Sequence, residues 1–235
     1  MEELSRTEML LGKDAVEALK DKRVIVFGVG GVGGYACEAL ARTGVGQIDL
    51  VDNDTVSLSN INRQIIALHS TVGKSKVEVM KERIFDINPK IKVNAKNMFF
   101  TPEISGEIDF SQYDYVVDAI DTVSGKIELV MLCNKAGVPI ISSMGAGNKQ
   151  DPCAFKVSDI YKTSVCPLAR VMRTELKKRG IKKLKVVYSE EKPASVAVAE
   201  PAVGKRPPAS IAFIPSVVGL IVASEVIKDL TKEKE

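Results

Sequence analysis

The sequence predicts an α/β protein with a doubly wound, Rossmann-like, mostly parallel sheet that further strands extend in the C-terminal third. Two observations carry this prediction. A continuous apolar run at 23–27 leads directly into a glycine-rich loop and then into a helical pattern. The same alternation of short apolar runs with helical patterns continues as far as residue 142. Such alternation is typical of parallel sheets that helices cover on both faces.

The first strand–helix–strand unit is the most regular part of the chain. Arg23–Phe27 reads RVIVF, as expected of a strand that is buried on both faces. A helix is predicted over Tyr35–Thr43, because Gly44 and the glycine two residues later are typical helix ends. Gln47–Val51 is the second predicted strand. A unit of this kind usually gives two parallel strands.

The remaining elements of the core, predicted over 1–150, alternate in the same way. Helical periodicity and strand-like apolar runs follow one another without a composition shift that would mark a domain boundary. The predicted helices are Lys74–Asp86 and Val123–Ala136, and the predicted strands are Ile91–Ala95, Tyr115–Ala119 and Val138–Ser142.

The C-terminal extension, 151–235, is predicted to continue the core within a single domain of 1–235. It is expected to contain a basic helix, a mobile loop and a closing helix. The predicted strands are Phe155–Ile160, Leu184–Tyr188 and Ser210–Ile214; the helices are Pro167–Lys178 and a last one from Ser216, as its cap, to Leu230; the loop is Glu190–Pro208.

Composition and termini restrict the class of protein. The formal net charge of the 235 residues is +3, so bulk charge does not indicate a nucleic-acid-binding protein. Residues 1–22 are charged throughout and do not resemble a secretory signal. The most apolar stretch, Ile211–Ser224, is shorter than the roughly 18 residues of a membrane span. We therefore expect a cytoplasmic protein without a membrane span.

The cysteines and the single histidine, His69, form no metal-binding or redox motif. No two cysteines have the C-x-x-C spacing of zinc sites and redox pairs. Cys166, just before a predicted helix, is the thiol best placed for chemistry. The alternative is that Cys166 is a partly buried structural thiol. The four cysteines are Cys37, Cys133, Cys153 and Cys166.

A phosphate-binding loop is predicted between the first strand and the first helix, at Gly28, Gly30, Gly31 and Gly33. Glycines let the backbone approach phosphate oxygens, and a helix N-terminus favours negative charge. Asp52 ends the second strand about 20 residues later, where a carboxylate accepts hydrogen bonds from ribose hydroxyls. These features predict an adenine nucleotide, but an NAD-dependent oxidoreductase fits them almost as well as an ATP-using enzyme.

Charged residues further along the chain favour a triphosphate over a dinucleotide. Arg63 lies in the polar loop after Asp52, and Lys76 lies at the start of the next predicted helix. Cleavage of a triphosphate develops negative charge that arginine, lysine and a metal ion stabilise. Asp121 follows a strand at the ligand-binding edge of the sheet, and is therefore the predicted ligand of Mg²⁺.

The loop GVGGVG and the segments VDNDTVSLSNINRQ, VGKSK and DAID resemble the adenylation core of the ubiquitin-activating-like superfamily. This superfamily includes the enzymes that activate sulfur-carrier proteins, and the resemblance covers residues 6–147. It implies an ATP site in which Asp52 binds the ribose and Asp121 binds magnesium. Asn60, Arg63 and Lys76 are implied to contact the phosphates. The cofactor-binding set is completed by the four loop glycines, Asp54 and Gln64.

The resemblance also implies a homodimer. Arg6, in SRTEMLLG, matches an arginine that in this superfamily usually reaches the ATP site of the partner subunit. The residues implied to be catalytic are Arg6, Arg63, Lys76 and Asp121.

Within the superfamily, the chain is most similar to the tRNA threonylcarbamoyladenosine dehydratases. This branch implies ATP-dependent cyclisation (dehydration) of threonylcarbamoyladenosine in tRNA, through adenylation of its carboxylate. The implied partner is tRNA carrying this nucleoside, and a sulfur-transfer partner protein stays open. The similar segments are SRTEMLLG, NRQIIALHSTVGKSK, INP, VVDAID, SMGAGNKQDP and SDIYKTSVCPLARVMRTELKKRGI.

The alternative within the superfamily is adenylation of the C-terminal glycine of a ubiquitin-like sulfur-carrier protein. Activators of that kind commonly have two C-x-x-C pairs, which this sequence lacks. A basic cluster near the C-terminus would attract a tRNA backbone, although a solvated helix face gives the same pattern. A non-catalytic nucleotide sensor also stays open. The cluster comprises Arg170, Arg173, Lys177, Lys178, Arg179, Lys182, Lys183 and Lys185, with Lys205 and Arg206 in the later loop.

Overall fold

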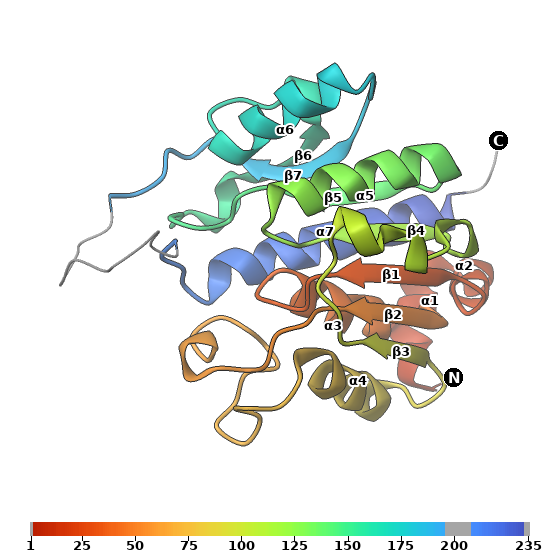
Figure 1. Cartoon of the computed structure of the whole chain (residues 1–235). Helices are drawn as coiled ribbons and strands as arrows, with labels where there is room; N and C mark the ends of the chain where they lie inside the picture. Colours follow the sequence, from red (N-terminus) through yellow and green to blue (C-terminus); the bar gives the residue numbers. More distant parts are fainter. Residues whose placement is uncertain (1, 196–207, 233–235) are drawn as a thin grey trace.

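The computed structural model describes residues 2–195 and 208–232 (Figure 1). The predicted loop Glu190–Pro208 falls mainly on 196–207, outside the described residues. Within the described ranges, the chain forms one sheet with helices on both faces.

The sheet confirms the predicted fold class. Seven strands lie in the order β3-β2-β1-β4-β5-β7-β6, and every neighbouring pair is parallel except β6 with β7. Chain order reverses between β1 and β4, which makes the carboxyl ends of these two strands the expected ligand-binding position. The strands are β1 (Arg23–Phe27), β2 (Gln47–Val51), β3 (Lys92–Lys96), β4 (Tyr115–Asp118), β5 (Ile140–Ser143), β6 (Phe155–Asp159) and β7 (Lys185–Ser189).

Helices connect the strands and cover the sheet. The α-helices are α1 (Ser5–Leu11), α2 (Lys13–Leu19), α3 (Gly33–Thr43), α4 (Lys76–Ile87), α5 (Val123–Ala136), α6 (Pro167–Lys178) and α7 (Phe213–Thr231). Short 3-10 helices are η1 (Glu2–Leu4), η2 (Leu58–Asn60), η3 (Pro102–Glu107), η4 (Phe110–Gln112), η5 (Pro152–Ala154) and η6 (Ile160–Lys162). No helix within the described ranges has the length and apolar character needed to cross a membrane.

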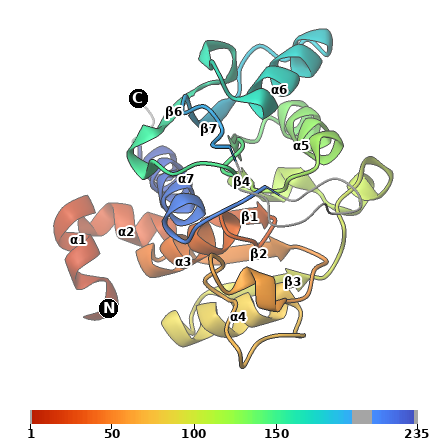
Figure 2. The same cartoon turned by 90° about the vertical axis from the view of Figure 1, so that its left-hand side faces the viewer.

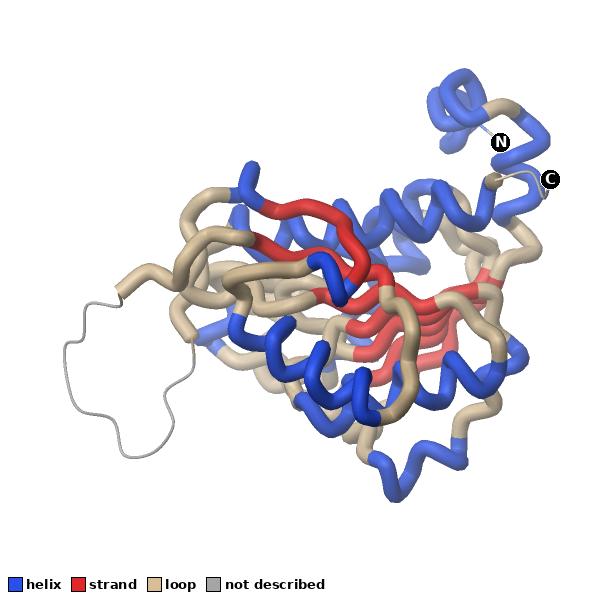
Figure 3. Tube along the Cα trace, turned by 90° about the horizontal axis from the view of Figure 1, so that it is seen from above, coloured by secondary structure: helices blue, strands red, loops and turns tan. Residues whose placement is uncertain are grey.

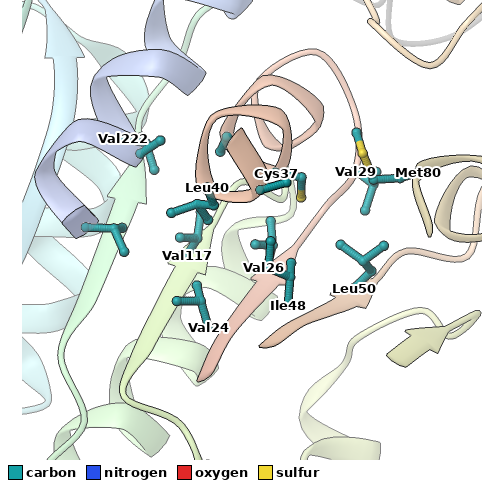
Figure 4. Close-up of a cluster of buried hydrophobic side chains, with 14 of the residues drawn as sticks. Val24, Val26, Val29, Cys37, Leu40, Ile48, Leu50, Met80, Val117 and Val222 are labelled. Carbon is teal, nitrogen blue, oxygen red and sulfur yellow. The ribbon is translucent and has the colours of Figure 1, made fainter. Parts of the chain in front are cut away.

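Alternation along β1 creates two apolar layers. Val24 and Val26 belong to a cluster with residues of α3, α4 and α7, whereas Ile25 and Phe27 belong to a cluster with residues of α5. Figure 4 shows the first cluster, in which Val222 of α7 and the β1 valines lie on either side of α3 residues. Both faces of β1 are therefore buried, as its continuous apolar sequence predicts.

The predicted strand Ser210–Ile214 is wrong. Helix α7 begins at Phe213, its N-cap is Ala212 rather than the predicted Ser216, and residues 208–210 form no strand. Pro215 is accommodated because the N–H groups of a first helical turn have no intrahelical acceptor. Ile214, Val218, Val222 and Val226 are all fully buried, and this four-residue spacing is that of a helix face. The apolar run therefore belongs entirely to the closing helix.

The other boundaries differ from prediction by at most two residues. The helix predicted from Lys74 begins at Lys76, because Ser75 forms an isolated antiparallel bridge with Thr55. That bridge holds the start of α4 against the loop that follows β2.

Helix α7 packs closely on α3 at Gly219. A Cβ atom at this position would overlap the carbonyl oxygen of Val32 and lie 2.9 Å from Cβ of Tyr35. We expect Gly219→Ala to separate the helices and to lower the free energy of unfolding by about 1–3 kcal/mol. Denaturant unfolding measures this change. Leu220→Ala, at a side chain that is 47% exposed, is the control and should have a much smaller effect. Equal stability of the two variants would contradict the packing.

Candidate active site

A cavity of about 580 Å³ lies at the carboxyl ends of the parallel strands. Figure 2 faces this edge of the sheet and shows the connections that lie there, with the loop after β2 in orange. The lining residues come from five parts of the chain: the glycine loop (Gly28, Gly30, Gly31, Val32), the end of β2 with its loop and the start of α4 (Val51, Asp52, Asn53, Asp54, Asn60, Arg63, Gln64, Lys76), the segment after β3 (Met98, Phe99, Phe100), the loop after β4 (Ala119, Ile120, Asp121, Thr122) and a C-terminal wall (Ala146, Gly147, Pro208, Ser210, Pro215).

Three loop glycines are required by the protein's own packing. Gly28 has a φ of +86°, and a Cβ there would lie 2.7 Å from the carbonyl oxygen of Ala119. A Cβ at Gly33 would overlap the carbonyl oxygen of Gly28. At Gly31 a Cβ would lie 3.0 Å from Cβ of Pro215 on α7. These glycines let the loop fit between β4 and α7.

Gly30 is different, because the protein leaves room for a side chain there. The nearest atom to its ideal Cβ position is Nε2 of Gln64, at 3.7 Å, and its φ is not positive. Gly30 lines the cavity, so the space of its missing side chain is open to a ligand. No described residue accepts a hydrogen bond from the backbone N–H groups of 30–33, and α3 has no side-chain cap. This arrangement suits an anion such as a phosphate.

The carboxylate of Asp52, just after the end of β2, accepts hydrogen bonds from the loop after β1 and from the loop after β2. Its Oδ2 accepts a hydrogen bond from the N–H of Val29 at 2.7 Å, and its Oδ1 accepts one from the N–H of Asp54 at 2.8 Å. Asp52 therefore faces the cavity from a fixed position beside the glycine loop.

Two cationic side chains reach the cavity, one of them paired with a carboxylate of a described residue and the other not. Lys76 is only 5% exposed and forms an ion pair with Asp54, with 2.7 Å between Nζ and Oδ2. Arg63 donates to the carbonyl oxygen of Ser59 at 2.8 Å and to Oδ1 of Asn62 at 2.9 Å, but forms no ion pair with a described residue. The guanidinium charge of Arg63 is therefore available to an anionic ligand.

Two amides of the NxxRQ segment lie beside these charges. Asn60 accepts a hydrogen bond from the N–H of Ser57 at 3.1 Å through Oδ1, as part of a capping box around η2. Gln64 is buried, and its Oε1 has no hydrogen-bond partner among the described residues. A buried amide oxygen without a partner is costly unless a ligand or water supplies a donor. The cavity therefore contains a buried hydrogen-bond acceptor that no described residue satisfies.

Asp121 is an exposed carboxylate at the tip of the loop after β4. It forms no hydrogen bond or ion pair with another residue of the described ranges. These ranges also contain no group of three or more His, Cys, Asp or Glu side chains that could hold a metal ion by themselves. One free carboxylate beside a phosphate-binding loop fits magnesium, which keeps several waters and takes oxygen ligands from phosphates.

The C-terminal wall is held in place by two asparagines. Asn148, with a φ of 57°, donates its N–H to the carbonyl oxygen of Ala209 at 2.8 Å and accepts from the N–H of Ala209 at 2.7 Å through Oδ1. Asn62 donates from Nδ2 to the carbonyl oxygen of Ser210 at 3.0 Å. Since Asn62 also accepts from Arg63, the wall and the free guanidinium are connected.

The structure brings almost all the predicted site residues together. Gly33 does not line the cavity but supports the loop from behind, as its packing against Gly28 shows. Arg6 does not line the cavity of its own chain, because it lies exposed on α1. Sequence reasoning missed the segment Met98–Phe100 and the C-terminal wall. The position of Met98–Phe100 directly after β3 could have indicated the former, since carboxyl ends of parallel strands share one edge.

The cysteines take no part in this cavity. Burial raises the pKa of the Cys37 and Cys133 thiols, so both are neutral packing groups. Cys166 is 2% exposed at the N-cap of α6, and Cys153 is exposed. None of the four lines the cavity, and all are free thiols.

The model of the ThiF family matches residues 4–235. The chain belongs to the ThiF family. The match extends through the C-terminal extension.

Named relatives are similar over the whole chain. The tRNA threonylcarbamoyladenosine dehydratase of Bacillus subtilis is 48% identical over 246 residues, covering 100% of this chain and 97% of the relative. The crystal structure of the E. coli tRNA N6-threonylcarbamoyladenosine dehydratase in complex with AMP has a TM-score of 0.90 and 35% identity, covering 97% of this chain and 94% of that chain. The same E. coli protein in complex with ATP has a TM-score of 0.87 and 34% identity, covering 97% and 93%.

The contrast between Gly30 and Gly33 yields a test of the phosphate-binding loop. We expect Gly30→Ala to leave the unfolding temperature nearly unchanged, because its Cβ has room in the free protein. A methyl group there would obstruct a phosphate and weaken ATP binding about tenfold or more, which is about 1.4 kcal/mol. Gly33→Ala should instead destabilise the fold. Calorimetric binding and thermal unfolding measure the two effects. Unchanged ATP affinity in Gly30→Ala would contradict this geometry.

Proposed function

We propose that this chain is an ATP-dependent tRNA threonylcarbamoyladenosine dehydratase. It cyclises threonylcarbamoyladenosine in tRNA after adenylation of the side-chain carboxylate. The observation that carries the proposal is the 48% identity to the Bacillus subtilis dehydratase over essentially the full length of both chains. The cavity supports it, because it offers anion-binding groups from several segments at one sheet edge. No comparable sequence identity among the relatives reported above supports an NAD-dependent oxidoreductase.

ATP fits the cavity with its phosphates at the glycine loop. The free N–H groups of 30–33 bind phosphate oxygens, and Arg63 and Lys76 add positive charge. The carboxylate of Asp52 accepts hydrogen bonds from the ribose hydroxyls. Asn60 assists at the phosphates, and the unpartnered amide of Gln64 takes a hydrogen bond from the nucleotide.

Asp121 is the residue that would hold magnesium, and bound magnesium would neutralise charge on the leaving pyrophosphate. The adenylation requires no general base from the protein, since a carboxylate is already ionised at neutral pH. His69 does not line the cavity, in agreement with this chemistry. The chain's own task is therefore to align the carboxylate with the nucleotide and to stabilise negative charge.

A basic surface on and after α6 supports tRNA as the substrate. Arg170, Lys177, Lys182 and Lys183 are exposed and form no ion pair with a described residue. The rest of the predicted cluster is partly neutralised. Lys178 and Arg179 pair with Glu175, and Lys185 pairs with Glu225 and Asp229. Arg173 keeps its charge but is held by hydrogen bonds to Thr163, while Lys205 and Arg206 lie outside the described residues. Four free cations still suit contacts with a phosphate backbone. A tRNA substrate also agrees with a cytoplasmic location.

A homodimer is supported by the N-terminal helices. Helices α1 and α2 project from the body of the molecule in both Figure 2 and Figure 3. Met9 and Leu10 on α1 are 87% and 85% exposed, and large apolar side chains so exposed commonly mark an interface. Arg6 lies on the same helix. We propose that α1 contacts a second copy and that Arg6 completes the partner's cavity.

The reaction is tested with purified protein, ATP, magnesium and tRNA carrying threonylcarbamoyladenosine. After digestion of the tRNA, mass spectrometry should show the modified nucleoside lighter by one water, with AMP formed. Asp121→Ala and Arg63→Ala should each lower turnover by about 100-fold or more without unfolding the protein, because each removes charge stabilisation. An unchanged nucleoside in a preparation that binds ATP would reject the dehydratase function.

The dimer is tested by mixing two inactive variants, Arg6→Ala and Asp121→Ala. A mixed dimer has one cavity with an intact Asp121 and an intact Arg6 from the partner. We therefore expect the mixture to regain a substantial part of the activity that each variant lacks alone. If activity stays absent although mixed dimers form, Arg6 does not act across the interface.

A further inference from the structure

A fully buried ion pair lies beneath the loop that carries Asp121. Lys126 and Asp118 are 1% and 0% exposed, and 3.0 Å separates Nζ from Oδ1. The ammonium also donates to the carbonyl oxygen of Ser143 at 2.8 Å and to Oγ of Ser142 at 3.4 Å. Oγ of Ser142 in turn donates to Oδ2 of Asp118. All three ammonium hydrogens therefore have acceptors, and both carboxylate oxygens have donors.

The pair closes the base of the Asp121 loop. Asp118 is the last residue of β4 and Lys126 lies in the first turn of α5, so the loop 119–122 stands between them. Within the loop, the N–H of Ile120 donates to Oδ1 of Asp118 at 3.3 Å. The loop lies directly over the phosphate-binding glycines, because a Cβ at Gly28 would lie 2.7 Å from the carbonyl oxygen of Ala119.

The same ammonium reaches a second loop of the cavity. Ser142 and Ser143 end β5, and the chain continues to Ala146 and Gly147, which line the C-terminal side. One buried charge thus connects β4, α5 and β5 at the edge where two cavity loops begin. Lys126 itself does not line the cavity, so any effect on the ligand acts through Asp121 and these loops.

We propose that Lys126 is a positioning residue, which with Asp118 fixes the Asp121 carboxylate in the place where magnesium and the nucleotide phosphates meet. The inference rests on the proposed ATP-dependent function. Burial of two charges is a poor source of stability, because desolvation offsets their attraction. Hydrogen bonds that orient the residues around a metal ligand, by contrast, change the affinity of many sites for their metal.

The test separates positioning from stability by a neutral replacement of similar shape. In the double variant Lys126→Met with Asp118→Asn, no charge is left buried alone, and the amide oxygen introduced at position 118 can still accept from Ser142. The matched control is Arg23→Met with Asp49→Asn, an ion pair of 2.9 Å whose carboxylate is also fully buried. In this second pair Arg23 begins β1 and Asp49 lies in the middle of β2, and neither residue lines the cavity.

The first readout is calorimetric affinity for ATP with magnesium and with a chelator, in the absence of tRNA. We expect the Lys126 and Asp118 double variant to bind ATP like the wild type when a chelator is present. The factor by which magnesium increases the ATP affinity should be about tenfold or more smaller in the variant than in the wild type. The magnesium concentration for half-maximal AMP formation should rise in parallel. The control pair should leave the magnesium effect unchanged.

A folded double variant with the wild-type magnesium effect would overturn the proposal. If the double variant does not fold, Ser142→Ala replaces it, since this change removes one acceptor of the ammonium and keeps the ion pair. It should weaken the magnesium effect by a smaller factor, and no change would again overturn the proposal. Because tRNA is absent from the binding measurement, a wild type that binds ATP and magnesium but leaves tRNA unmodified would reject the dehydratase function alone.

Discussion

The close approach of the β1–α3 loop to its neighbours is the constraint on which the rest of the structure depends. The loop passes under Ala119, just after β4, and against Pro215 of α7, with no space for a side chain at Gly28 or Gly33 and little at Gly31. This contact brings the N-terminus of α3 to the edge of the sheet, with the N–H groups of 30–33 unpaired among the described residues. It also sets the height of the Asp121 loop above the phosphate-binding backbone. The nucleotide cavity therefore follows from backbone packing before any charged side chain is considered.

Charge in the cavity and directly beneath it is divided between groups that are satisfied within the protein and groups that are not. Lys76 with Asp54, and Lys126 with Asp118, are paired internally and maintain the shape of the site. Arg63 and Asp121 carry opposite charges and have no charged partner among the described residues. A magnesium nucleotide presents the complementary combination of phosphate oxygens and a cation. This division agrees with a site that is formed before its ligand arrives.

The sequence predicts the strands and most helices because local signals and burial agree there. β1, β2, α5 and α6 have the predicted bounds, and Gly137 with its φ of 71° and Pro167 mark two of the ends. The prediction failed for α7, where a proline in the first turn looked like a break. It also could not show that Lys126 is buried, since a lysine on a helix ordinarily faces solvent. The glycine loop and the charged residues were predictable from motifs, but the C-terminal wall was not. Its contacts with Asn62 and Asn148 join residues far apart in the chain.

The C-terminal wall has a consequence for how the protein is made. Pro208, Ser210 and Pro215 complete a cavity whose first residues are Gly28 and Gly30, and α7 covers the central strands from the end of the chain. A ribosome synthesises the N-terminal strands first, yet the growing chain lacks one side of the cavity until α7 has emerged. The complete cavity therefore forms only after residues 208–215 have been synthesised, so the earlier strands emerge before the site is enclosed on that side.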